Sequence, residues 1–154
     1  SKLSTILNNI GMCHLNLSEY EKSLEFLQSS LSMRQSSANN NNSHSINKLD
    51  EAASLNNIGV AYFYKQNFTQ ALEYLEKSLS LRKEYYASRK NTNSIIKNSS
   101  DFDLVLAESY NNIGMCYMEL EQFEKALDNF QACLKIKKRQ NNIKIESDNE
   151  NSDF

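Results

Sequence analysis

The chain is poor in the residues that form cross-links, metal sites and catalytic sites. Its 154 residues include no proline, three cysteines and two histidines. Three cysteines cannot all pair with one another, and none lies in a C-x-x-C motif, which argues against a disulfide framework and favours a reducing, intracellular setting. Neither His14 nor His44 has an acidic or cysteine partner at metal-ligand spacing. No phosphate-binding loop, nucleophile elbow or acid–base pair is present, so we expect no enzyme, no cofactor and no metal.

Charge and hydrophobicity argue against a nucleic-acid or membrane partner. The net charge is only −2, and no apolar run approaches the ~20 residues that span a bilayer. The basic residues 135–139 fall at an expected helix end, where cations complement the helix dipole. They lack the aromatic interleaving of a nucleic-acid site. We therefore expect protein partners and a cytoplasmic location.

One short motif occurs three times in the chain. The sequence Asn-Asn-Ile-Gly ends at Gly11, Gly59 and Gly114, and an aromatic residue follows each glycine by nine positions. The glycines themselves are separated by 48 and then 55 residues. A unit of fixed internal spacing with variable connectors is the signature of a repeat architecture.

Apolar residues in each unit recur at helical spacing, which predicts three helix pairs and no strands. The three glycines fall in the middle of the first helix of each pair, where glycine costs about 1 kcal/mol relative to alanine. We expect close helix packing as the reason, with a small residue opposite each glycine. The expected helices lie near residues 2–17, 20–34, 47–65, 68 onward, 101–120 and 122–139, with Asn47 and Ser100 or Asp101 as N-caps.

The units resemble the tetratricopeptide repeat (TPR). Its signature is matched in order by Leu55, Ile58, Gly59, Tyr62, Ala71 and Leu75, and again by Tyr110, Ile113, Gly114, Tyr117, Ala126 and Phe130. The first unit departs from it with His14 for tyrosine and Ser23 for alanine. Gln35, Lys83 and Lys138 replace the closing proline of the family. The Leu-Asn-Asn-Ile-Gly opening and the Ser78–Lys83 ending are similar to the kinesin-light-chain-like subgroup.

This resemblance implies an all-α, right-handed superhelical array, an α-solenoid. Its three helix–turn–helix units are expected at about 4–35, 52–83 and 107–138, within an array covering 1–140. Asn/Ser-rich inserts are expected at about 36–46 and 90–100. Residues 141–154 are polar, acidic and aperiodic, and we expect them to form a disordered tail.

The resemblance also implies a concave groove, lined by the first helix of each unit, that binds peptide segments. Asparagine amides suit the backbone of an extended peptide, methionines are adaptable contacts, and Phe63 and Tyr64 are the expected anchors. Asparagine is abundant throughout the chain, so the alternative interpretation is that these asparagines reflect composition alone. Glu108 argues against a carboxylate clamp, because it would repel a terminal carboxylate. The expected groove residues are Asn8, Asn9, Met12, Asn56, Asn57, Val60, Phe63, Tyr64, Glu108, Asn111, Asn112, Met115 and Met118.

We interpret the chain as a protein-interaction scaffold, either an adaptor or a complex-assembly module. Two alternatives stay open: a regulatory or docking array of a larger enzyme, and a purely architectural subunit. Both ends of the array lack a polar capping helix, which is expected in a fragment of a longer protein and permits self-association. We expect exposed apolar area on the last helix, at Phe130 or Ile136.

Overall fold

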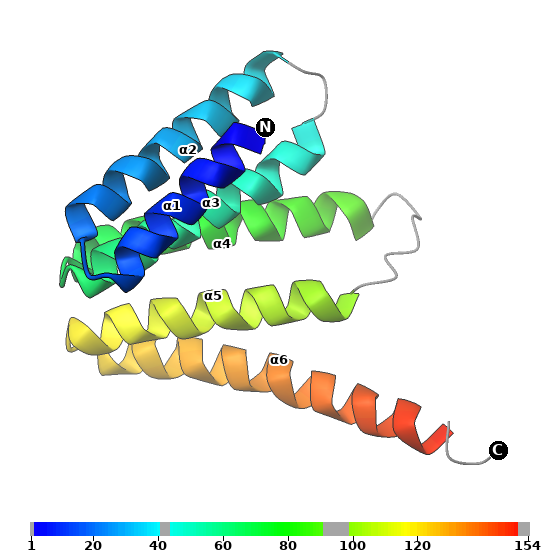
Figure 1. Ribbon diagram of the computed structural model, residues 1–154. Helices are drawn as coiled ribbons and strands as arrows, with labels where there is room; N and C mark the ends of the chain where they lie inside the picture. The colour runs from blue at the N-terminus through cyan, green and yellow to red at the C-terminus, as the bar shows by residue number, and fades with distance from the viewer. Residues whose placement is uncertain (1, 41–43, 91–98, 151–154) are drawn as a thin grey trace. The chain divides into compact units, whose positions relative to one another are not determined.

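The computed structural model describes residues 2–40, 44–90 and 99–150, and the side chains of 2–36, 48–88 and 101–142. The described residues are helical apart from short turns, as expected for an all-α fold (Figure 1). They form two compact units: residues 1–94 hold the first four helices, and residues 95–154 hold the last two. The helices are α1 (Lys2–Asn16), α2 (Tyr20–Asn40), α3 (His44–Tyr64), α4 (Phe68–Lys90), α5 (Ser99–Glu119) and α6 (Phe123–Glu150).

Several helices run further than the sequence predicted. α3 begins at His44, so Asn47 lies inside the helix and is not its N-cap. α6 continues to Glu150, so most of the tail expected to be disordered from residue 141 is helical. These stretches contain no proline or glycine, and the propensity cost of asparagine and serine is only tenths of a kcal/mol per residue. Residues 41–43 and 91–98 of the inserts lie outside the described residues.

The turn inside each helix pair has the same backbone conformation. Ser18, Gln66 and Glu121 occupy equivalent positions and have φ values of 60°, 63° and 57°. In the second unit the amide N–H of Asn67 donates to the carbonyl of Tyr62 at 2.9 Å, and the N–H of Gln66 donates to that of Phe63 at 2.9 Å. This is a Schellman motif with a residue other than glycine in the left-handed position. The sequence marked these turns as breaks but did not predict their conformation.

The mid-helix glycines permit close helix contact, as expected. A Cβ atom on Gly59 would lie 2.7 Å from Cγ of Leu75, and one on Gly11 would lie 2.7 Å from Cγ of Leu27. On Gly114 it would lie 2.8 Å from Cε1 of Phe130. The sequence placed a small residue opposite each glycine. The structure adds the large side chain that fills the space left by the missing methyl group.

A buried hydroxyl also ties the two helices of a pair together. Ser30 Oγ donates to the carbonyl of Ser4 at 2.6 Å, and Ser78 Oγ donates to the carbonyl of Ala52 at 2.7 Å. All three serines are almost completely buried. Cys133 holds the equivalent position in the third unit, where the thiol is a weaker donor.

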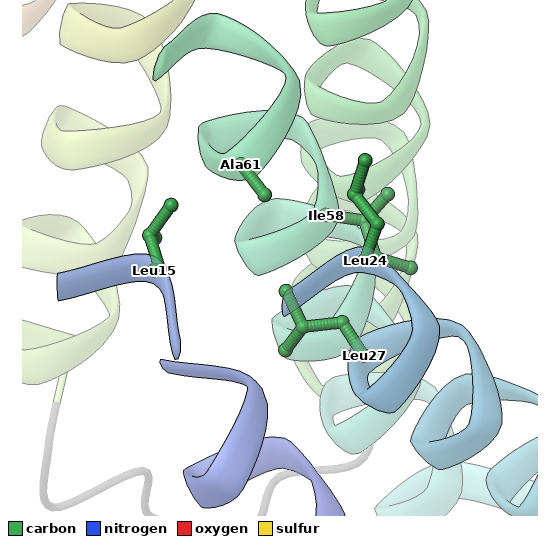
Figure 2. Packing of buried hydrophobic residues seen from close by; sticks show 5 residues of the cluster. All are labelled: Leu15, Leu24, Leu27, Ile58 and Ala61. Atoms are coloured by element: carbon green, nitrogen blue, oxygen red, sulfur yellow. The ribbon is translucent and has the colours of Figure 1, made fainter. Parts of the chain in front are cut away.

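The core of the first compact unit joins α1, α2 and α3. Leu15, Leu24, Leu27, Ile58 and Ala61 form one buried cluster (Figure 2). Leu15, near the end of α1, is only 6% exposed and belongs to this core. α2 therefore packs on its own partner α1 and also on α3 of the next pair.

Polar contacts show that α2 and α3 run in opposite directions. Near the end of α2, Arg34 Nη1 donates to the carbonyl of Asp50 at 2.7 Å and lies 3.3 Å from its carboxylate. Near the start of α2, Glu21 pairs with Lys65 at 3.1 Å. These two ion pairs bracket the apolar contact between the helices.

Apolar residues are exposed on α1 and on α6, among other helices. On α1, Leu3 and Ile10 are exposed, as is Cys13, and no described residue covers them. On α6, the exposed residues are Phe123, Leu127 and Leu134. Phe130 and Ile136, which we expected to be exposed, are half-buried. Phe130 is drawn inward because it packs against Gly114.

Candidate functional site

The expected binding residues of the first two units meet on one face of the first compact unit. α1 and α3 lie side by side there, and Asn57 Nδ2 donates to Asn8 Oδ1 at 2.9 Å. Both amides are half-buried, whereas Asn9 is exposed. A side-chain amide has two donor hydrogens and an acceptor oxygen, so this bond leaves each amide further hydrogen-bonding positions. We call the surface formed by Asn8, Asn9, Met12, Asn57, Val60 and Tyr64 the α1–α3 face.

An apolar strip lies beside the amide pair. Met12 and Val60 are half-buried and pack against the core cluster. Asn56 departs from the expectation, because it is only 7% exposed and thus lies largely beneath the surface. Its Oδ1 atom is buried without a hydrogen-bond partner among the described residues. Asn57 thus provides the accessible amide of the second unit.

The two expected aromatic anchors have different environments. Phe63 is half-buried, and its ring lies edge-on to Phe68 with 5.4 Å between centroids. Tyr64 lies at the end of α3 and is 57% exposed. Phe63 therefore stabilises the junction of α3 and α4, and Tyr64 is the aromatic side chain that a partner can reach.

A pocket of about 210 Å³ opens next to Tyr64. It lies beside the turn between α1 and α2, and part of its wall comes from the left-handed residue Ser18. The sequence did not predict this pocket, because the pocket depends on the backbone conformation of the turn. Its lining residues are Leu15, Asn16, Ser18, Tyr20 and Tyr64.

A second, more open cleft of about 410 Å³ lies between α2, α3 and α4. Leu31, Leu55 and Leu81 form its apolar part, while Gln35 and Lys77 are among its polar residues. It was not predicted either, since its walls come from three helices.

The expected site residues of the third unit lie on α5, in the second compact unit. Glu108, Asn111 and Met118 are exposed, and Asn112 and Met115 are half-buried. All five lie within three turns of one helix.

His14 and Glu19 fix the C-terminal end of α1. The His14 ring stacks on Phe26 with 5.3 Å between centroids, which fits the aromatic position expected for it. His14 Nδ1 lies 2.5 Å from Glu19 Oε2, and Lys22 Nζ donates to Glu19 Oε1 at 2.9 Å. The hydrogen bond from Lys22, followed by that from His14, lowers the pKa of the Glu19 carboxyl.

The described part of the chain contains no group of three residues arranged to hold a metal ion. Its helices also include none that is both long and apolar enough to cross a membrane.

Comparisons with known proteins agree with the repeat interpretation. A family model described as tetratricopeptide repeat matches residues 2–84, and a second model with the same description matches residues 107–139. No curated protein sequence matches the chain significantly.

Two solved structures have similar folds. One is BtubC (BKLC) from P. vanneervenii, with 21% identity and a TM-score of 0.72, covering 92% of this chain and 49% of BtubC. The chain thus spans about half the length of BtubC. The other is the TPR domain of Arabidopsis FLU, with 20% identity and a TM-score of 0.65, covering 87% of this chain and 93% of that domain. The predicted all-α fold of three helix–turn–helix units is confirmed, as is the resemblance to the tetratricopeptide repeat.

Proposed function

Because the chain belongs to the tetratricopeptide repeat family, whose repeats generally mediate protein–protein interaction, we propose that its α1–α3 face binds an extended segment of a partner protein. The chain would then act as an adaptor or complex-assembly module. The observation that carries the proposal is the Asn57–Asn8 hydrogen bond, which places two amides from different repeat units within reach of one ligand backbone.

The chemistry of the face suits a segment with little net charge. Amide groups can both donate to and accept from a peptide backbone whatever its side chains. Met12 and Val60 offer an apolar strip beside these amides. The pocket beside Tyr64 is large enough for one partner side chain, and the exposed tyrosine ring forms one wall.

A peptide library displayed on phage tests this function even though the partner is unidentified. Peptides selected on the intact chain are synthesised and titrated against wild-type protein, Tyr64→Ala and Asn8→Ala. Gln28→Ala, an exposed substitution on α2, is the matched control. We expect both face variants to bind at least about tenfold more weakly, which corresponds to 1.4 kcal/mol, and the control to bind normally.

Circular dichroism checks that every variant keeps its helicity. Peptides that bind Tyr64→Ala and Asn8→Ala as well as wild type would place binding elsewhere and refute the proposal.

A further inference from the structure

α6 carries an apolar stripe on its outer surface. Phe123, Leu127 and Leu134 are 61%, 56% and 52% exposed. Their spacing of four and seven residues places them on one face of the helix. The inward face is separate, because Ala126 and Cys133 are buried within the α5–α6 pair.

The chain itself shows what such a stripe binds. In the first unit, the equivalent positions on α2 are Tyr20, Leu24 and Leu31. Leu24 lies in the buried cluster with Ile58 and Ala61 of α3 (Figure 2). Tyr20 and Leu31 pack against that cluster. A stripe of this kind is therefore a docking face for an antiparallel helix that presents a β-branched residue and a small residue.

The charges beside the stripe specify the partner further. Arg34 on α2 contacts both the carbonyl and the carboxylate of Asp50, in the N-terminal half of α3. The equivalent residue on α6 is Lys137, which is exposed. A cation at this position favours a helix with an acidic residue toward its N-terminus, where the helix dipole also favours negative charge.

A second copy of the chain fits this surface poorly. α1 exposes Ile10 and Cys13 at the positions of Ile58 and Ala61, so its apolar residues are suitable. At the position of Asp50, however, α1 has Lys2, which would face Lys137, and like charges in close contact repel each other.

The described chain also does not return over the stripe. α6 continues for 16 residues beyond Leu134, which is about 24 Å at a rise of 1.5 Å per residue. Figure 1 shows this part of α6 leading away from its partner α5.

We propose that the α6 stripe docks an amphipathic α-helix of a partner protein, antiparallel to α6. That helix has an acidic residue facing Lys137, a β-branched apolar residue eight positions later and a small residue three positions after that. The surface is separate from the α1–α3 face, so the proposal does not depend on the function proposed above.

The test uses a labelled peptide with the sequence of residues 48–66, which contains Asp50, Ile58 and Ala61. Isolated helices of this length are marginal in water, so a side-chain staple on the face away from Ile58 holds the peptide helical. The peptide is titrated against the intact chain by fluorescence anisotropy. We expect saturable binding that Leu127→Glu weakens about tenfold or more; Leu127 is exposed, so this change leaves the helical circular dichroism signal intact.

A charge exchange separates the proposed geometry from general electrostatic attraction. Lys137→Glu in the chain should weaken its binding of the wild-type peptide. A peptide carrying Asp50→Lys should bind this chain variant more tightly than the wild-type peptide does. Lys135→Glu is the matched control, because it makes the same change at an exposed position on another side of α6. Equal effects of Lys135→Glu and Lys137→Glu would overturn the proposed orientation.

Two further results would overturn the proposal. One is the absence of saturable binding to the wild-type chain. The other is concentration-dependent self-association of the chain that Leu127→Glu abolishes, since a second copy would then cover the stripe.

Discussion

Gly59→Ala tests the close helix contact that recurs in all three units. The added Cβ would lie 2.7 Å from Cγ and 3.0 Å from Cδ2 of Leu75, and 3.1 Å from the carbonyl oxygen of Ala71. Leu75 is only 1% exposed, so its side chain has little room to rotate away from the added methyl group. The variant must therefore separate the helices or distort the leucine.

Two opposing effects determine how much Gly59→Ala changes the free energy of unfolding. Alanine improves helix propensity by about 1 kcal/mol relative to glycine, whereas overpacking a filled core costs about 1–3 kcal/mol. A contact as short as 2.7 Å belongs in the upper part of that range. We expect a net loss of about 1–2 kcal/mol, or roughly 2–8 °C in Tm for a chain of this size.

Urea unfolding followed by circular dichroism measures this loss. Leu75→Ala removes the clashing atoms and alone costs about 2–5 kcal/mol. The double variant should lose less than the sum of the two, because the new methyl group fills part of the cavity. Gly114→Ala is the internal comparison: its Cβ would meet the ring of Phe130, which is half-buried and has more room to turn, so the loss should be smaller. A Gly59→Ala variant that is stabilised by the full propensity gain would refute the packing argument.

Three further predictions concern stability. Ser30→Ala removes the buried hydrogen bond to the carbonyl of Ser4 and should cost about 1 kcal/mol in urea unfolding, whereas Ser29→Ala on the exposed side should have little effect. Gln66→Gly should stabilise the chain by about 0.5–1 kcal/mol in the same assay. The left-handed conformation costs about 1–2 kcal/mol for a residue with a Cβ, and the greater freedom of glycine in the unfolded chain offsets part of the gain from removing that cost. Destabilisation would show that the φ of 63° is not strained. The pKa of Glu19 is lowered from 4.5 by Lys22 and His14. The stabilising contribution of the Glu19 carboxylate is therefore present above pH 4.5 and is lost as the pH falls through the lowered pKa. Glu19→Gln should reduce the acid-induced loss of stability measured by urea unfolding across the acid range, and an unchanged pH profile would contradict the role given to Glu19.

The sequence predicted the fold because its strongest signals act within one unit. Gly59 and Leu75 lie 16 residues apart, and the same spacing recurs in the other two pairs. A costly glycine repeated at one place indicates a contact, and that contact exists in each pair. Helix ends were predicted less well, because asparagine and serine neither stop a helix nor strongly favour one.

The sequence did not predict which residues are buried by contacts between one repeat unit and the next. Ile10 and Ile58 are the same residue at the same position of the repeat, yet Ile10 is 36% exposed and Ile58 is fully buried. The difference comes from α2, which packs on α3, whereas no described helix packs on that face of α1. Local periodicity has no information about such a neighbour.

The prediction of the candidate site was also incomplete, because it depends on contacts that the helical periodicity does not contain. Asn56 and Asn57 are successive residues, about 100° apart around α3. The sequence placed both on the binding face, but the structure buries Asn56 and directs Asn57 to Asn8. The pocket beside Tyr64 depends on the backbone of the turn at Ser18, which has no glycine to mark it.

The Asn57–Asn8 hydrogen bond connects two repeat units on the same surface where we propose that a partner binds. A partner whose backbone takes over either amide competes with the contact between α1 and α3, while one that uses only the remaining donor and acceptor positions leaves it intact. In the first case, binding energy and the rigidity of the junction are thermodynamically linked, and the linkage is reciprocal. A substitution elsewhere in the chain that strengthens this bond would then weaken the partner's affinity by the same free energy, even though the substituted residue does not touch the partner.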